Sequence, residues 1–252
     1  MQKIILATLI ATLLLANSPA QEKPWTEWTK VDADKILNNS PWSQTQTDTD
    51  TSEMMYSPTS QAGINSGTRS GVVGGQSERQ SINSNRASQG ALNQAISVNY
   101  HVRLLSAKPV RQAFMRVIEL AQKEPDKKLS RDLQAFVDRD FGEYIAVAVS
   151  FDSTDGRYSG PALQAFNSAT LGTLKTKTYL ERKDGKRVFL MDYYTPINDG
   201  IGAKFIFPRI VDEQMFIKAD TGSFRFYSEV GQIKLNVTFK TPELMYNGQL
   251  EY

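Results

Sequence analysis

The 252-residue chain contains no cysteine, a single histidine at position 101 and a formal net charge of only +2. The lack of cysteine excludes disulfides, thiol nucleophiles and thiolate metal sites, and a single histidine excludes the catalytic zinc sites that need two or three. The balanced charge gives no electrostatic reason to expect nucleic acid as a partner.

The first twenty residues have the pattern of a secretory signal peptide. Lys3 precedes an apolar run over residues 4–16, and small residues follow at Ser18 and Ala20. This pattern predicts cleavage after Ala20. Because a membrane-spanning helix needs about 20 apolar residues, the mature chain is expected to have no transmembrane segment and to be periplasmic or extracellular. An uncleaved N-terminal anchor is the alternative.

Residues 21–56 are predicted to form an N-terminal arm that packs on the main domain. A capping pattern at Thr29 and Asp32 indicates a short helix over 30–37, and alternating Thr indicates an edge strand over 43–55. The arm contains all the tryptophans of the chain, Trp25, Trp28 and Trp42. We interpret these rings as a buried clamp, with sugar stacking as the alternative.

Residues 57–91 are rich in Ser, Gly, Asn and Gln, with scarcely an apolar side chain. This composition buries too little surface to offset the entropy of ordering, so the segment is predicted to be a disordered loop. Since residues 21–56 are too few to fold alone, the loop is expected to interrupt one domain. The main domain is then formed by residues 92–252.

The first half of the main domain mixes strands and helices. Apolar alternation predicts a strand from about 96 to 104, and a continuous apolar run predicts a strand over 144–151 that is covered on both faces. Helices are predicted from Pro109, over about 129–137, and from about 159 to 171. Two helices between the strands predict a parallel pair with a right-handed crossover, and therefore a mixed sheet.

The second half is predicted to be an antiparallel β-meander, which makes the fold class α+β. Its expected strands cover residues 175–182, 187–194, 202–208, 224–230 and 233–240. The last of these alternates strictly, so only one of its faces should be buried. The Asp184-Gly185 pair predicts a two-residue type I′ turn.

Four short stretches resemble an uncharacterised group of exported bacterial proteins with a WTKxDAxKIL…SPW motif at the N-terminus. They are residues 28–42, 109–113 (PVRQA), 199–209 (DGIGAKFIFPR) and 245–252 (MYNGQLEY). No activity is known for this group. The resemblance implies export and a single fold, and it implies no catalytic, cofactor-binding or metal-binding residue.

Recognisable catalytic motifs are missing from the sequence. As a general base, His101 would need a carboxylate partner and a nucleophile, and residue spacing identifies neither. Acids at Asp48, Asp50 and Glu53 are too few for a calcium motif, so we predict no metal and no cofactor. One enzymatic alternative is a glycosidase-like hydrolase that uses two carboxylates chosen from Asp152, Asp155, Asp192 and Asp199.

The hairpin around Asp184 is the candidate binding site. A two-residue turn places Lys183 opposite Lys186 and Arg182 opposite Arg187, and facing like charges are destabilising. An anionic ligand would relieve this repulsion, as would solvent and salt. With Lys234 and Lys240, these residues predict an exported, non-enzymatic binding or envelope-assembly protein that docks an acidic protein or surface.

The cleavage site gives the first testable prediction. The exported protein should have the intact mass of a chain that begins at Gln21, because Ala20 completes the small-residue pattern that signal peptidases require. Mass spectrometry of the exported fraction measures this directly. A chain that still begins at Met1 would contradict the secretion hypothesis.

Overall fold

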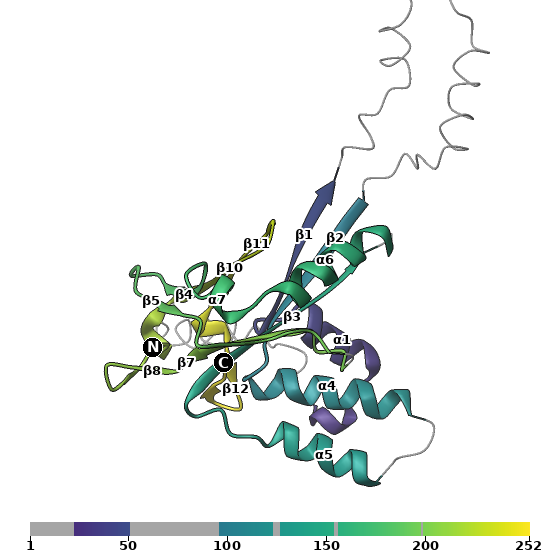
Figure 1. The fold of residues 1–252 in the computed structure, drawn as a ribbon. Helices are drawn as coiled ribbons and strands as arrows, with labels where there is room; N and C mark the ends of the chain where they lie inside the picture. The colour runs from purple at the N-terminus through teal and green to yellow at the C-terminus, as the bar shows by residue number, and fades with distance from the viewer. Residues whose placement is uncertain (1–22, 51–95, 123–126, 154–155, 198) are drawn as a thin grey trace, which may run out of the picture.

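A computed structural model describes residues 23–50, 96–122, 127–153, 156–197 and 199–252. The predicted signal peptide and the predicted loop over 57–91 lie outside these ranges. The described chain is an α+β fold, as predicted, in which two antiparallel sheets pack face to face (Figure 1). Helices α4 and α5 lie beyond one end of the sheets, and α6 lies towards the other end.

The larger sheet has five strands in the order β1-β2-β3-β7-β6. Their bounds are Ser43–Asp50 (β1), Ile96–Leu104 (β2), Tyr144–Ser153 (β3), Ala203–Pro208 (β7) and Asp192–Tyr194 (β6). β1 is an edge strand, as its polar sequence predicts, and it pairs with β2 along its whole length. The predicted arm therefore contributes a strand to the sheet of the main domain.

The smaller sheet has four strands in the order β11-β10-β4-β5. Their bounds are Ile233–Lys240 (β11), Ser223–Val230 (β10), Thr178–Arg182 (β4) and Arg187–Phe189 (β5). Strict alternation buries one face of β10 and β11, as the sequence predicts. The predicted strand over 187–194 is divided, because its first part joins this sheet as β5 and its second part joins the larger sheet as β6. Two short hairpins complete the chain, β8–β9 (Ile210–Val211 and Gln214–Met215) and β12–β13 (Met245–Tyr246 and Gln249–Leu250).

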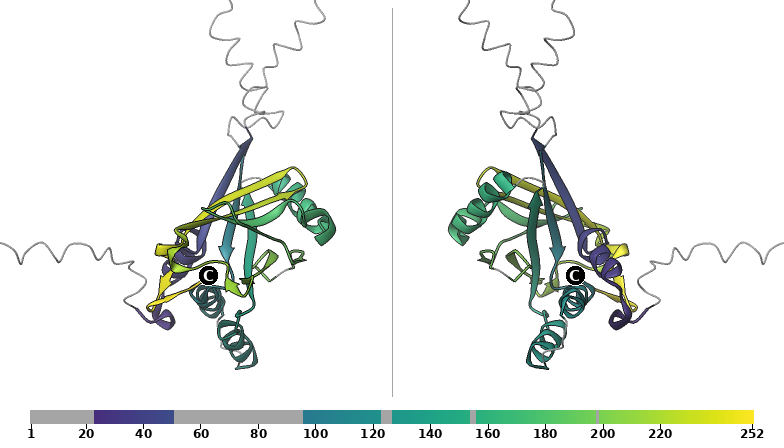
Figure 2. Two further views of the ribbon diagram at one scale, coloured as in Figure 1. Left: turned by 90° about the vertical axis from the view of Figure 1, so that its left-hand side faces the viewer. Right: turned by 90° about the vertical axis from the view of Figure 1, so that its right-hand side faces the viewer.

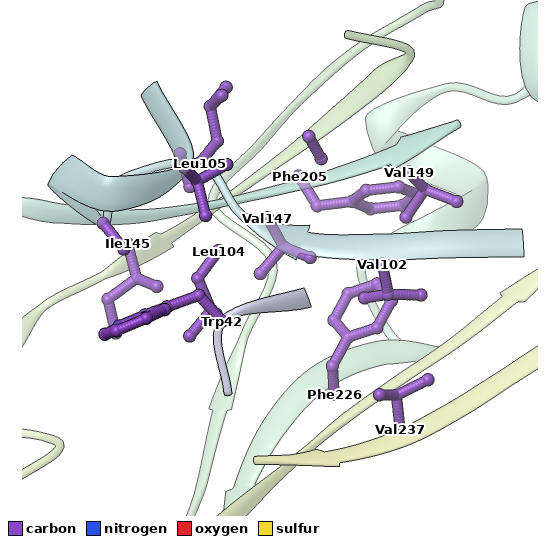
Figure 3. Close-up of a cluster of buried hydrophobic side chains, with 14 of the residues drawn as sticks. Trp42, Val102, Leu104, Leu105, Ile145, Val147, Val149, Phe205, Phe226 and Val237 are labelled. Atoms are coloured by element: carbon purple, nitrogen blue, oxygen red, sulfur yellow. The ribbon is translucent and has the colours of Figure 1, made fainter. Parts of the chain in front are cut away.

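The main core lies between the two sheets. Val102, Val147 and Val149 project from the larger sheet towards Phe226 and Val237 of the smaller one (Figure 3). Phe226 makes an edge-on contact with the ring of Phe205, with 5.4 Å between the ring centroids. Figure 2 shows the β10–β11 hairpin lying against the strands of the larger sheet. Packing of apolar rings and β-branched side chains thus replaces the missing disulfides as the source of stability.

The side chain of Gln46 joins the edges of the two sheets. From edge strand β1, the Gln46 amide nitrogen donates to the backbone oxygen of Lys234 at 2.7 Å, and its oxygen accepts from the backbone nitrogen of Asn236 at 2.9 Å. Both of these partners belong to β11, the edge strand of the smaller sheet. The Gln46 amide therefore satisfies edge groups that would otherwise be free to pair with another chain.

The helices between β2 and β3 form a hairpin, and the predicted parallel crossover is wrong. Helices α4 (Lys108–Ala121) and α5 (Lys127–Val137) pack on each other, and β2 pairs with β3 antiparallel. The Arg111 side chain, at the start of α4, donates to the backbone oxygens of Val137, the last residue of α5, and of Arg139 just after it. Because the helical hairpin begins and ends at the same place, β3 runs back along β2. Every pairing among the described strands is antiparallel, so the sheet is not mixed.

The third predicted helix is present but begins earlier than expected. Helix α6 runs from Gly156 to Ser168 with Pro161 inside it, and the short helix α7 (Leu171–Leu174) follows. Phe166 of α6 stacks on Phe151 of β3 with 5.4 Å between the ring centroids. The helix thereby covers the end of the larger sheet that extends beyond the smaller one.

The predicted tryptophan clamp is confirmed for Trp28 and Trp42, whereas the third ring, Trp25, is only partly buried against the core. Trp28 and Trp42 are 1% and 4% exposed, so neither ring offers a face to a sugar. Between them lies helix α1 (Lys30–Asn38), with the predicted capping box of Thr29 and Asp32 at its start. The indole nitrogen of Trp42 donates to the backbone oxygen of Glu251 at 2.9 Å, which ties the N-terminal arm to the C-terminal segment.

Gly202 gives a prediction about stability. Its φ is +92°, and a Cβ atom there would collide with the backbone oxygen of Val149. Gly202→Ala should therefore destabilise the fold by more than about 3 kcal/mol. Gly185 is the matched control, because its φ is +83° and nothing lies near its missing Cβ. Gly185→Ala should cost only about 1–2 kcal/mol, the cost of the backbone conformation alone. Urea denaturation of both variants checks this, and equal losses would contradict the packing argument.

Candidate functional site

The outer face of the four-stranded sheet carries a row of paired charges. Arg187 on β5 donates to Glu181 on β4 at 2.8 Å, and Arg225 on β10 donates to the other oxygen of the same carboxylate. Hydrogen bonds from Arg187 and, to a lesser extent, from Arg225 lower the pKa of the Glu181 carboxyl below its usual value. Desolvation would raise this pKa, but the hydrogen bonds outweigh it. One carboxylate therefore serves two guanidinium groups, and this row has an excess of positive charge.

An aromatic row lies beside the charged row. The rings of Tyr227 and Tyr179 stack at a centroid distance of 5.1 Å, and Phe189 meets Tyr179 edge-on at 5.8 Å. The Arg187 guanidinium lies 4.4 Å from the centroid of the Tyr179 ring. Cation–π contact and cross-strand stacking hold these side chains in fixed positions on the sheet face.

The candidate basic hairpin has a different register from the predicted one. The backbone nitrogen of Arg182 donates to the oxygen of Lys186, and Arg187 lies opposite Glu181. The loop is therefore three residues long, with Gly185 at positive φ, and the two predicted facing pairs are replaced by Arg182 opposite Lys186 and Glu181 opposite Arg187. The physical reason is the Asp184 carboxylate, which accepts from Arg182 at 2.8 Å and from the backbone nitrogen of Lys186 at 3.2 Å.

The four hairpin residues thus separate into two classes. Arg182 is held by the carboxylate of Asp184 in the hairpin loop, and Arg187 by the carboxylate of Glu181 on β4. Lys183 and Lys186 are exposed, and neither forms an ion pair with a residue in the described ranges. Beside Lys183 is an open hollow of about 320 Å³ whose lining includes Arg182, Arg225 and the hydroxyl-bearing Ser223 and Thr238. Of the other predicted cations of this face, Lys240 pairs with Glu243 at 3.0 Å, and Lys234 is exposed at the opposite end of the sheet.

His101 has partners that residue spacing did not reveal. Its Nε2 lies 2.5 Å from a carboxylate oxygen of Asp152 on β3, and its Nδ1 lies 2.9 Å from the hydroxyl of Thr45 on β1. Asn99 donates to the second Asp152 oxygen at 3.0 Å. Burial would raise the pKa of Asp152, but the hydrogen bonds from His101 and Asn99 outweigh it, and the pKa is lowered. The strand pairing brings these residues together, which only the tertiary structure decides.

This hydroxyl, imidazole and carboxylate do not form a competent nucleophile system. The Thr45 hydroxyl has one proton and also lies 3.0 Å from the backbone oxygen of Asn38, to which it donates. When the hydroxyl proton is donated to Asn38, the Thr45 oxygen can only accept a hydrogen bond from His101. His101 then cannot act as the base that removes the Thr45 proton, so the hydroxyl is not activated as a nucleophile. Further along the same two strands, Thr47 donates to Asn99 at 2.8 Å. We interpret the whole set as a polar ladder that holds β1, β2 and β3 together.

The carboxylates that were candidates for a hydrolase have separate partners. Asp152 is bound to His101, and Asp199 forms an ion pair with Lys204 at 2.7 Å. Asp192 accepts from the backbone nitrogen of Tyr193 at 2.8 Å, whereas Asp155 lies outside the described residues. Within the described ranges, no group of three or more His, Cys, Asp or Glu side chains is placed to hold a metal ion.

The residues that carry the family resemblance have structural roles. Arg111 is buried among backbone oxygens, and Gln112 accepts a hydrogen bond from the hydroxyl of Tyr246 at 2.8 Å. Glu251 caps the start of α4 by accepting from the backbone nitrogen of Lys108 at 3.0 Å. Arg209 donates to the backbone oxygen of Tyr252 and lies over its ring. These side chains therefore tie helix α4 and the C-terminal segment to the rest of the fold.

Comparison with known proteins gives no relative: no family model, no curated protein and no solved structure matches this chain. None of the helices in the described part of the chain is long and apolar enough to span a membrane. The functional argument therefore depends on the geometry of this molecule alone.

Acidification should weaken the ladder around Asp152. The folded-state pKa of Asp152 lies below its usual value, so its contribution is present above about pH 4 and is lost as pH falls through the folded pKa. Asp152→Asn should therefore be less stable than the wild type at pH 6, by no more than about 1 kcal/mol because the carboxylate is 62% exposed. Urea denaturation at pH 6 and pH 3 measures the difference. A difference that stayed the same at pH 3 would show that the carboxylate charge is not responsible.

Proposed function

We propose that this chain is an exported, non-enzymatic binding or envelope-assembly protein that docks an acidic protein through the outer face of its four-stranded sheet. The observation that carries the proposal is the excess of cations on this face. Arg187 and Arg225 share the single carboxylate of Glu181, and Lys183 and Lys186 extend the positive region at the hairpin tip. Export is inferred from the signal pattern over residues 1–20.

The chemistry of the face favours a protein partner. Aromatic and arginine side chains are enriched at the centres of protein interfaces, and Tyr179, Tyr227 and Arg187 are held rigid by mutual contact. Rigid side chains lose little entropy on binding. Peripheral lysines contribute mainly to the association rate and to salt sensitivity, which is the role expected of Lys183 and Lys186.

The carboxylate-pair hydrolase has less support. The three candidate acids within the described ranges, Asp152, Asp192 and Asp199, have separate hydrogen-bonding partners, and none of these partners is a carboxylate. Glycosidases instead need two carboxyl groups that face each other across the scissile bond. The binding hypothesis is therefore the one that the side-chain geometry favours.

The test uses a glutamate-rich peptide and its glutamine counterpart, titrated against the mature protein at low salt. The glutamate peptide should bind and the glutamine peptide should not. The double variant Lys183→Ser/Lys186→Ser should weaken binding about three- to tenfold, because exposed charge pairs contribute up to about 1 kcal/mol each. Glu181→Gln should strengthen binding, because it removes a repelling carboxylate and frees Arg187 and Arg225.

Two controls make the result decisive. Lys30→Ser/Lys127→Ser removes the same charge from exposed positions on α1 and α5, and it should leave the affinity unchanged. Raising the salt to 500 mM should weaken binding in the wild type by screening the charges. Equal losses in the two double variants would move the site away from the hairpin, and absence of binding at low salt would refute the acidic-partner proposal.

A further inference from the structure

A second hollow lies on the opposite side of the molecule, on the outer face of the five-stranded sheet. Its volume is about 470 Å³, within the range of 300–1,000 Å³ that is usual for small-molecule sites. The sheet contributes its floor through Ala146 and Ile206, and the end of α5 and the segment after it contribute one wall. This hollow is separate from the basic hairpin, with which it shares no lining residue.

The lining is mainly apolar, and parts of it are unusually exposed. Met191 and Tyr194 are 49% and 54% exposed, although the residue before each of them, Leu190 and Tyr193, is buried. The remaining apolar lining residues are Leu105, Phe136, Phe141, Tyr144, Ala146 and Ile206. When an apolar ligand covers exposed apolar side chains of this size, their removal from water lowers the free energy of the complex.

Three charged side chains reach the same hollow, and two of them are already engaged. Lys204 forms an ion pair with Asp199 at 2.7 Å, and Asp192 hydrogen-bonds the Tyr194 hydroxyl, which raises the pKa of that tyrosine. Arg139 is different, because its guanidinium donates to the Tyr144 hydroxyl at 3.3 Å and forms no ion pair with a carboxylate in the described part of the chain. Arg139 is therefore a cation with no carboxylate partner in the described ranges, and it lies beside an apolar surface in a lining that also holds the negative charge of Asp192.

We propose that this hollow binds a monoanionic amphiphile of the long-chain carboxylate class. The carboxylate would meet Arg139 and the Tyr144 hydroxyl, and the alkyl chain would lie over Ile206 and the rings of Phe136 and Phe141. A guanidinium matches a carboxylate in shape and charge, which favours this headgroup over a neutral one. The proposal does not depend on the acidic-partner function, because it uses different residues on a different sheet.

Calorimetric titration of the mature protein with decanoate, octanoate and 1-decanol tests this proposal. Decanoate should bind saturably, and octanoate should bind about fifteenfold more weakly, because each buried CH₂ contributes about fourfold in affinity. Arg139→Gln should weaken decanoate binding about tenfold and leave decanol binding unchanged. Arg131→Gln is the matched control, an exposed arginine of α5 outside the lining, and it should have no effect.

The outcomes separate this proposal from its alternatives. Met191→Glu should weaken both decanoate and decanol, since it removes apolar surface and adds a negative charge at the rim. Equal decanoate affinity in Arg139→Gln and Arg131→Gln, or no dependence on chain length, would overturn the proposal. Binding of the glutamate-rich peptide should be unchanged in Arg139→Gln, so failure here leaves the acidic-partner proposal standing.

Discussion

The fold depends on one buried arginine at the junction of the helices and the larger sheet. Arg111 donates to the backbone oxygens of Leu105, Ser106, Val137 and Arg139, and it lies 4.7 Å from the centroid of the Phe141 ring. Burial lowers its pKa to about 10, far enough above neutral pH for the guanidinium to stay charged. Backbone oxygens compensate this charge, and the contact closes the helical hairpin that sends β3 back along β2.

The antiparallel return has consequences for the rest of the molecule. It places β7 beside β3, and it lets the segment after α5 lie over the outer face of the larger sheet, where the apolar hollow forms. On the inner face, the same sheet packs on β10 and β4 through rings such as Phe205 and Phe226. A chain without disulfides reaches a single arrangement in this way because its two sheets share one continuous core.

The two outer faces have different chemistry because different forces shape them. On the smaller sheet, carboxylates and guanidiniums alternate across strands, and Asp184 organises the loop that presents Lys183 and Lys186. On the larger sheet, hydroxyls and amides form a ladder around His101 at one end, and apolar side chains surround Arg139 at the other. The two faces therefore differ in their chemistry, because charged side chains dominate one and apolar side chains the other.

The sequence by itself determined the periodic features of this protein. Alternation predicted β2 and β11, the 3.6-residue period predicted α4, and the capping pattern at Thr29 predicted α1. These features depend on neighbours in the chain, so local spacing is sufficient to find them. Even the α+β class follows, because it needs only the order of the elements.

Only the tertiary structure decided strand direction, register and the grouping of side chains. The crossover prediction failed because the contact that closes the helical hairpin joins Arg111 to Val137, which no periodicity reveals. The hairpin register failed by one residue because Asp184 favours a three-residue loop. His101 and Asp152 are 51 positions apart and meet only through pairing of β2 with β3. Contacts of this kind are set by the packing of whole elements, and for that reason the candidate sites could not be read from spacing alone.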